Sequence, residues 1–318
     1  MEKLFFETSG STGTPKSFAY TLDILQEEAE ALRPYFADRK RVVSVVPMRH
    51  IFGYVMGTVF PDRLGIERFH LPPLPVAELF DALRPGDLLV AFPLFWQAVL
   101  ERFAMRGNRT ADLVGLTASS PCPPEVIKTL TSPSPQGDTP YCTSLMEIYG
   151  STETSAIGIR VSPDVPYTLL PVWERIAFEE DSFHIRRVRS DGSREEAVPL
   201  PDDIIWHGEK LLTPVKRKDN AVQVGGINVY PFRVAEIIRL HPAVKDCAVR
   251  LMRPDEGVRL KVFIVPEDSV VSRGKEAFGK EFKAWLHKQL KPAEMPKSIT
   301  LGTELPLTAT GKSSDWGI

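Results

Sequence analysis

The sequence lacks the marks of several protein classes. Its three cysteines lie far apart, with no C-x-x-C pair and no cysteine–histidine spacing of a metal site, so we expect neither a disulfide framework nor a structural zinc site. The first ten residues are too short and too polar for a secretory signal peptide. The longest apolar stretch, residues 42–61, is interrupted by prolines and charged residues, and we therefore expect no membrane span. This composition suits the reducing cytoplasm.

An excess of charge of either sign is also absent. The 39 basic and 41 acidic residues leave a net charge of -2, so nucleic acid is not expected as a partner, because its phosphates need a cationic surface. Hydrophobic residues make up 43% and charged residues 25% of the chain, which is typical of globular proteins and excludes disorder. Only proline is abundant, with 28 among 318 residues, and this predicts rigid, extended loops. The length predicts about two domains.

Strand and helix patterns alternate in the first half of the chain. Short apolar runs predict strands, and apolar residues spaced by three and four positions predict helices. Pro34 is expected to kink or end the first helix. The expected strands are 4–7, 42–46, 88–92 and 113–117, and the expected helices are 22–36, 95–105 and 123–130. This alternation predicts an α/β fold with a mostly parallel sheet flanked by helices.

The second half has a different pattern. Short β-like pieces between turn signals predict a small antiparallel β unit over about residues 165–216. Beyond residue 219 the pattern is mixed α+β. The expected helices there are 231–240 and 278–286, and the expected strands are 246–251 and 260–265.

A loop rich in glycine and hydroxyl groups follows the first expected strand. It runs from Thr8 to Lys16 with the sequence TSGSTGTPK. Small residues let the backbone approach an anion closely, and successive N–H groups can surround phosphate oxygens. A P-loop of the G-x-x-x-x-G-K-[ST] type is excluded, because Pro15 occupies the second glycine position and has no N–H. The loop still predicts a phosphate contact, and the alternative is a solvated turn.

The loop resembles the phosphate loop of the adenylate-forming ANL superfamily, which includes acyl- and aryl-CoA synthetases. Further segments follow in the order of that family along nearly the whole chain. They are PMRHIFG at 47–53, ASSPCPPE at 118–125, YGSTE at 149–153, RKD at 217–219, GGINVYP at 225–231 and LPLTATGK at 305–312. The resemblance implies a large N-terminal domain over 1–217 that includes the small β unit, a hinge at 218–219, and a small mobile α+β lid over 220–318.

The family reaction has two halves, and the resemblance implies an AMP-forming acid–thiol ligase. A carboxylate first attacks the α-phosphorus of ATP, which gives an acyl-adenylate and pyrophosphate. The thiol of CoA, or of a carrier-protein pantetheine, then displaces AMP. The implied cofactors are therefore ATP, Mg²⁺ and CoA or carrier-protein phosphopantetheine, and the implied substrate is a small carboxylic acid.

The resemblance also implies roles for individual residues. Lys312 would reach the carboxylate and the α-phosphate, Thr152 would hydrogen-bond phosphate, and Glu153 would help to hold Mg²⁺, the alternative being a carboxylate at a helix start. Asp203 and Arg217 would hold the ribose, Asp203 being chosen because it lies 14 residues before Arg217 (217 − 203). The remaining nucleotide-binding residues are Thr8, Ser9, Gly10, Ser11, Thr12, Gly13, Thr14, Lys16, Ser119, Ser120, Pro121, Tyr149, Gly150 and Ser151.

The acyl and thiol sites follow from the same resemblance. His50 would lie beside the carboxylate and the thiol route, and its alternative is a core or loop histidine. Ile148 would shorten the acyl pocket, which favours a small aromatic or short acyl acid. Asp219 would be the pivot, and Gly225 and Gly226 would line the pantetheine tunnel.

The chain also departs from the family pattern. Its phosphate loop begins at Thr8, where family members carry well over a hundred preceding residues, so the usual N-terminal subdomain is expected to be missing. A partner or a homodimer would then cover an exposed flank of the sheet. A second hypothesis is therefore a catalytically reduced nucleotide-binding or assembly subunit, although Lys312, Glu153 and Thr152 are intact.

Overall fold

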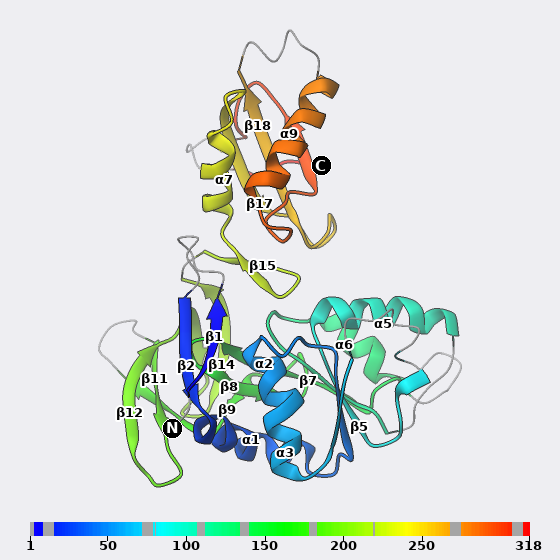
Figure 1. Ribbon diagram of the computed structural model, residues 1–318, viewed down its shortest axis with the longest axis vertical. Helices are drawn as coiled ribbons and strands as arrows, with labels where there is room; N and C mark the ends of the chain where they lie inside the picture. Colours follow the sequence, from blue (N-terminus) through cyan, green and yellow to red (C-terminus); the bar gives the residue numbers. More distant parts are fainter. Residues whose placement is uncertain are drawn as a thin grey trace. The chain divides into compact units, whose positions relative to one another are not determined.

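The computed structural model describes residues 3–8, 16–71, 79, 81–106, 112–133, 140–177, 183–218, 220–267, 275–306 and 314–318. These residues divide into two compact units, one ending at Lys218 and the other running from Asn220 to Ile318 (Figure 1). Among these residues, buried apolar side chains form two cores in the first unit and a separate core in the second.

A nine-stranded mixed sheet organises the first unit, with the order β13-β14-β9-β8-β7-β6-β5-β3-β4. Its parallel half, from β4 to β7, runs in one direction, and from β7 to β13 the neighbours are antiparallel. The parallel strands are β3 (Arg41–Ser44), β4 (Glu67–His70), β5 (Asp87–Ala91), β6 (Val114–Thr117) and β7 (Ser144–Ser151). The antiparallel strands are β8 (Ser155–Arg160), β9 (Tyr167–Leu169), β13 (Asp202–Trp206) and β14 (Leu211–Arg217).

Helices cover both faces of the parallel half. Successive residues of a strand point to opposite faces, and Val42 and Leu88 accordingly pack into one core while Val43 and Leu89 pack into another. The first core includes α1 (Leu22–Phe36), α2 (Ile51–Tyr54) and α3 (Phe60–Leu64), with a π-helical turn at Val55–Val59 between the last two. The second core includes α5 (Pro93–Arg106) and α6 (Pro124–Thr131). The expected α/β class is confirmed.

The β unit differs from expectation, and Pro34 does not end the first helix. Pro34 lies inside the last turn of α1, which continues to Phe36. The strands between 165 and 216 do not form one unit. Only β10 (Trp173–Ala177), β11 (Phe183–Val188) and β12 (Arg194–Pro199) make a separate antiparallel sheet. Strands β9, β14 and β13 instead extend the large sheet, because β9 pairs with the edge of β8.

An antiparallel hairpin begins the chain. Its strands are β1 (Lys3–Thr8) and β2 (Lys16–Thr21), and Thr8 is the register partner of Lys16. Phe6 and Tyr20 point from the two strands into the first core. The two ends of the loop predicted to bind phosphate are therefore held side by side by a strand ladder.

The second unit is a small α+β arrangement. It begins with a hairpin of β15 (Val222–Val224) and β16 (Ile227–Val229), whose two-residue turn, Gly225-Gly226, has φ values of 59° and 79°. Positive φ at both positions is the geometry that glycine supplies at no steric cost. Then follow α7 (Pro231–Arg239), β17 (Val244–Leu251), β18 (Leu260–Pro266), α9 (Lys275–Gln289) and β19 (Ser298–Leu301).

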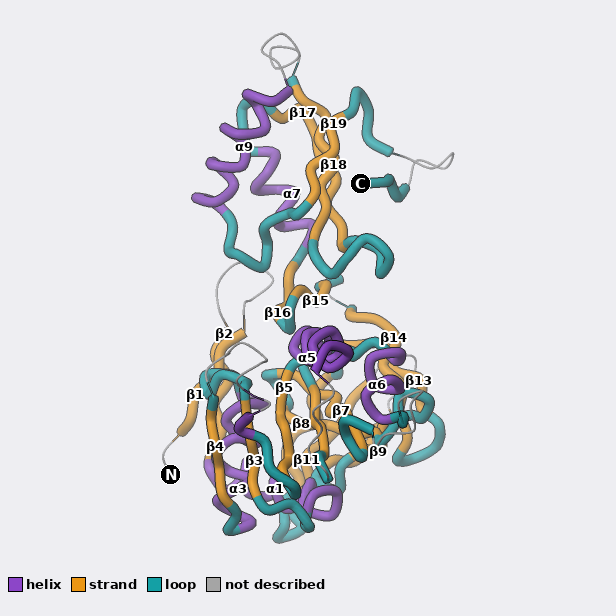
Figure 2. The backbone as a smooth tube through the Cα atoms, turned by 90° about the vertical axis from the view of Figure 1, so that its right-hand side faces the viewer, coloured by secondary structure: helices purple, strands orange, loops and turns teal. Residues whose placement is uncertain are grey.

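The last residues of the chain pack on the open side of this three-stranded sheet. Helices α7 and α9 lie on one side of β17, β18 and β19, and the C-terminal segment lies on the other (Figure 2). Leu260 and Val262 of β18 face the helices, whereas Lys261 and Phe263 face the C-terminal segment. There, the rings of Phe263 and Trp316 meet edge to face at 5.8 Å.

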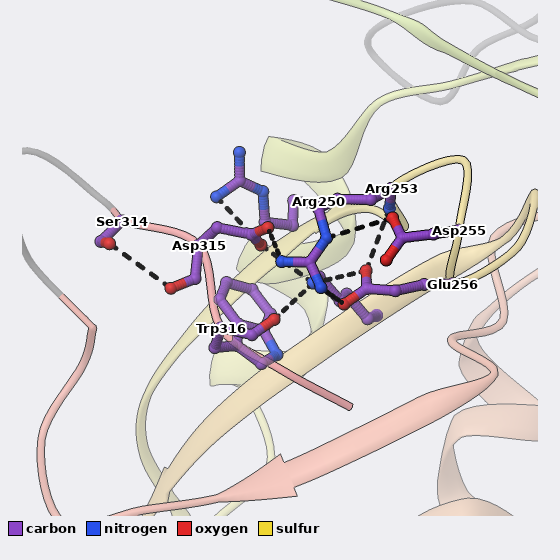
Figure 3. Close-up of polar contacts among 8 residues, drawn as sticks. Arg250, Arg253, Asp255, Glu256, Ser314, Asp315 and Trp316 are labelled. Carbon is purple, nitrogen blue, oxygen red and sulfur yellow. Dashed lines mark hydrogen bonds and ion pairs between the residues drawn. The ribbon is translucent and has the colours of Figure 1, made fainter.

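A buried lysine anchors the C-terminal segment. The Lys261 ammonium, which has no exposed surface, lies 2.9 Å from Asp315 Oδ1 and 2.7 Å from Glu256 Oε2, and it donates to the Trp316 carbonyl at 2.5 Å. Arg253 bridges the same two carboxylates, at 2.8 Å from each (Figure 3). The hydrogen bond from Lys261, followed by the backbone N–H of Trp316 and the charge of Arg250, lowers the pKa of Asp315 to about 2.

Candidate active site

The carboxyl ends of the parallel strands bring the sequence motifs to one edge of the large sheet. Neighbouring parallel strands end at the same edge, and ligands of α/β proteins bind there. The segment with His50 follows β3, residues 118–123 follow β6, and the Y-G-S-T-E motif occupies the end of β7. Because β3, β5, β6 and β7 are consecutive neighbours in the sheet, the topology alone places these three motifs along one edge.

The Y-G-S-T-E motif forms the end of β7 and the tight turn into β8, not the start of a helix. Ser151 and Thr154 hydroxyls lie 3.0 Å apart across this turn, and Glu153 is exposed at its tip. A Cβ atom on Gly150 would lie 2.2 Å from the Ser155 carbonyl oxygen. Glycine is therefore needed there because the two strands approach so closely. The turn presents a hydroxyl and a carboxylate on a fixed backbone.

The loop after β6 is held by a buried carboxylate. The Cys122 N–H donates to Glu147 Oε1 of β7 at 2.8 Å, and Arg160 donates to the other oxygen at 2.5 Å. Burial raises the pKa of Glu147, against the effects of the Cys122 N–H and of Arg160. Ser119 in this loop has a φ of 79°, a conformation that non-glycine residues rarely adopt. The predicted nucleotide-binding residues Ser119, Ser120 and Pro121 therefore lie on a loop that is tied to the strand of the Y-G-S-T-E motif.

An aspartate next to the predicted one meets the motif tyrosine. The Tyr149 hydroxyl donates to Asp202 Oδ2 at 2.6 Å, and Asp202 is the register partner of Arg217 across β13 and β14. Asp203, the residue chosen from the sequence, is instead the partner of Lys216. Burial, and next the charge of Asp202, raises the pKa of Tyr149. The structure thus brings together Tyr149, Asp202 and Arg217.

His50 and Ile148 lie in apolar surroundings. The His50 ring meets Phe92 edge to face at 6.0 Å. Its pKa is lowered, first by burial and then by the nearby charge of Arg49, so the imidazole is neutral near pH 7. Ile148 is 7% exposed and packs in the core that includes α1, α2 and α3.

A magnesium ion fits the residues of the turn. Mg²⁺ is usually bound by one or two carboxylates together with substrate phosphates. Within the part of the chain that the structure describes, no group of three or more His, Cys, Asp or Glu side chains could hold a metal alone. The exposed carboxylate of Glu153 is the kind of single ligand that such a shared site requires.

Comparison with known proteins settles the family. The family described as AMP-binding enzyme matches residues 5–174, and the AMP-binding enzyme C-terminal domain matches residues 233–312. The chain belongs to the AMP-binding enzymes. It is thus an adenylate-forming enzyme of the ANL superfamily, as its motifs predicted.

The curated relatives of this AMP-binding enzyme include bacterial ligases. A 4-coumarate–CoA ligase of Halorhodospira halophila is 33% identical over 309 residues, which cover 97% of this chain and 74% of the relative. The 4-coumarate–CoA ligase of Cereibacter sphaeroides is 33% identical over 317 residues, covering 98% and 70% of the two chains.

Solved structures share the fold. An amide bond synthetase from Marinactinospora thermotolerans has a TM-score of 0.74 at 19% identity, covering 97% of this chain and 67% of that one. A malonyl-CoA ligase complex with methylmalonyl-CoA and AMP has a TM-score of 0.70 at 20% identity, covering 95% and 71%. In the described part of this AMP-binding enzyme, no helix is long and apolar enough to cross a membrane.

Several predicted site residues of the AMP-binding enzyme lie outside the described residues. They are Ser9, Gly10, Ser11, Thr12, Gly13, Thr14, Asp219 and Lys312. The flanking Thr8 and Lys16 are register partners in the first hairpin, and Gly225 and Gly226 form the turn between β15 and β16.

The sequence analysis did not identify the buried residues that hold the turn after β7 in place. Tyr20, Glu28 and Arg187 contact its backbone or its serine. The sequence did contain an indication for Glu28, which lies three residues after Leu25 and four before Leu32 on the apolar face of α1. An acid in the middle of such a stripe is buried and needs partners.

Proposed function

We propose that this AMP-binding enzyme activates a carboxylic acid with ATP and transfers the acyl group to the thiol of CoA. The observation that carries the proposal is the gathering of the nucleotide motifs at one edge of the sheet, at the ends of β3, β6 and β7. In the first half-reaction a carboxylate oxygen bonds to the α-phosphorus while the bond to the bridging oxygen breaks, releasing pyrophosphate. In the second, the thiolate bonds to the acyl carbon, the bond to AMP breaks, and the thiol proton passes to solvent.

Nucleotide binding is assigned to residues on this edge. We propose that Thr152 donates to a phosphate oxygen and that Glu153 shares Mg²⁺ with the phosphates, the metal serving to neutralise their charge. The loop between β1 and β2, with Lys16, would hold the phosphates that leave, since N–H groups and cations stabilise the developing charge. The residues after β6, Ser119 to Pro121, would line the adenine.

The ribose site is assigned to Asp202 and Arg217, with Asp203 as the competing carboxylate. Asp202 faces Arg217 across two paired strands and accepts from Tyr149, so it is held in one orientation. A fixed carboxylate is well suited to accept hydrogen bonds from two ribose hydroxyls. Tyr149, Gly150 and Ser151 would complete this side of the nucleotide.

Lys312 is the proposed catalytic cation for the first half-reaction. An ammonium group that contacts both the carboxylate and the α-phosphate offsets their repulsion as they approach. A rotation near Asp219 would then bring the turn of Gly225 and Gly226 to the pantetheine. A few residues can absorb such a hinge motion.

The acid is proposed to be small and aromatic. The 4-coumarate–CoA ligases at 33% identity support an aromatic acid, and the branched side chain of Ile148 would limit the depth of the pocket. Neutral His50 would line the route of the thiol. CoA is the proposed acceptor, and a carrier-protein pantetheine is its alternative.

The test is ATP–pyrophosphate exchange with a panel of hydroxycinnamic, benzoic and short aliphatic acids. Pyrophosphate exchange should require an acid and Mg²⁺. Lys312→Ala should abolish the exchange, because its ammonium is proposed to offset the repulsion between the carboxylate and the α-phosphate. Lys288→Ala is the matched control, since Lys288 is an exposed lysine of α9. Thioester formation with CoA or with a pantetheinylated carrier protein then identifies the acceptor. AMP binding without exchange for any acid would instead support a nucleotide-binding subunit.

A further inference from the structure

A tyrosine of the first hairpin reaches the turn after β7. Tyr20 lies on β2, four residues after Lys16, and its hydroxyl donates to the Thr152 carbonyl at 2.7 Å across 132 residues of sequence. Its ring is buried against Phe6, with 6.0 Å between the ring centroids. The strand that leaves the phosphate-binding loop is therefore bonded directly to the residue proposed to contact phosphate.

A buried ion pair holds the next residues of the same turn. The Ser155 hydroxyl donates to Glu28 Oε1 at 2.9 Å, and Arg187 Nη2 donates to the Thr154 carbonyl at 2.9 Å. Glu28 Oε2 and Arg187 Nη2 lie 3.9 Å apart, and their side chains are only 2% and 3% exposed. Three elements, β2, α1 and β11, thus fix three residues of one turn from its inner side.

Burying Glu28 and Arg187 costs more free energy than an ordinary structural contact requires. Removing a carboxyl and a guanidinium group from water is offset only when geometry and hydrogen bonding are good, and apolar residues of similar volume are often as stable. The two groups nevertheless lie 3.9 Å apart, so they do not make their best contact with each other. Each of them instead contacts the turn. Ser155 also has a φ of 59°, which persists only where surrounding groups determine the backbone.

We infer that Tyr20, Glu28 and Arg187 are positioning residues that hold the Thr152–Ser155 turn in the geometry required for the magnesium–pyrophosphate group. The inference rests on the proposed function, because that function places phosphate and Mg²⁺ at Thr152 and Glu153. It goes further by tying strand β2 of the first hairpin to that turn. Supporting residues of this kind typically change metal affinity or activity tenfold or more when they are replaced.

The decisive variant is Tyr20→Phe, which keeps the ring and removes only the hydroxyl. The apparent Mg²⁺ activation constant of pyrophosphate exchange should rise about tenfold, with the KM of the acid unchanged. Tyr35→Phe is the control, because Tyr35 also packs against the first core, and the structure gives its hydroxyl no hydrogen bond to the turn. A Tyr20→Phe enzyme with the Mg²⁺ dependence of the wild type would overturn the inference, whatever its melting temperature.

Two further measurements do not depend on turnover. Calorimetric binding of magnesium pyrophosphate should weaken about tenfold in Tyr20→Phe and in Glu28→Gln, and hydrogen exchange at the amides of residues 151–156 should accelerate in both variants. Their double variant should show less than the sum of the two losses, because both act on one turn. If no acid supports exchange in the wild type, the proposed function fails, and hydrogen exchange still decides the positioning role. Equal hydrogen-exchange rates at residues 151–156 in Tyr20→Phe and Tyr35→Phe would refute the positioning role of Tyr20.

Discussion

Replacing Glu28 with glutamine should change how the stability of the first unit depends on pH. The Glu28 carboxyl is completely buried, and burial raises its pKa from 4.5 to about 7, although Arg187 and the Ser155 hydroxyl oppose the change. Below pH 4.5 the carboxyl holds its proton in both the folded and the unfolded chain. Between pH 4.5 and 7 only the folded chain keeps the proton, so rising pH favours unfolding.

The magnitude follows from the two pKa values. The difference between about 7 and 4.5 corresponds to about 3 kcal/mol at 1.36 kcal/mol for each pH unit. Glutamine has no proton to lose. The unfolding free energy of the wild type, minus that of Glu28→Gln, should therefore fall by about 3 kcal/mol between pH 4 and pH 8.

Urea unfolding of both proteins at closely spaced pH values measures this difference. Other groups with shifted pKa values, such as Glu147 and His50, are present in both proteins and cancel in the subtraction. A difference that stays constant, or that rises with pH, would show that the Glu28 carboxyl is already ionised in the folded protein well below neutral pH. Burial would then not control the protonation of Glu28.

Three other variants test the geometry. Gly150→Ala should lower the unfolding free energy by about 1–3 kcal/mol through overpacking, because the new methyl group would lie 2.2 Å from the Ser155 carbonyl oxygen. A urea midpoint equal to that of the wild type would contradict the close approach of the two strands. Asp202→Asn should weaken AMP binding about tenfold in calorimetry, as expected for the loss of one charge-assisted hydrogen bond to the ribose, and Asp203→Asn should not; the reverse result would return the ribose site to Asp203. Lys261→Met should accelerate hydrogen exchange at residues 314–318, since the ammonium contacts both Asp315 and the Trp316 carbonyl, and unchanged exchange would show that the Arg253–Asp315 ion pair and the ring packing hold the segment without it.

Long periodic segments were predictable from the sequence. Helix α1 shows apolar residues at helical spacing and begins and ends at the expected residues. The inner parallel strands β5 (DLLVA) and β6 (VGLT) are short, buried at every position, and consequently mostly apolar. The motifs that identify the family are local in sequence, so they were readable without any knowledge of the fold.

Relations between distant segments were not predictable in the same way. The pairing of β9 with β8 and of β14 with β9 depends on a free sheet edge, which no local pattern records. A one-residue offset separates Asp202 from Asp203, and only the strand register with Arg217 distinguishes them. The bond from Tyr20 to Thr152 joins residues 132 positions apart, and a tyrosine in an alternating strand carries no sign of its partner.

The anchored C-terminal segment has a consequence for folding during synthesis. Lys261 leaves the ribosome 55 residues before the Trp316 carbonyl that accepts its hydrogen bond. Until then its ammonium must remain in water or pair with Glu256 alone, so β18 cannot bury that face. The second unit can therefore finish folding only when the residues around Trp316, which cover this face of β18, have emerged. By then the whole sequence of the first unit has already been available to fold.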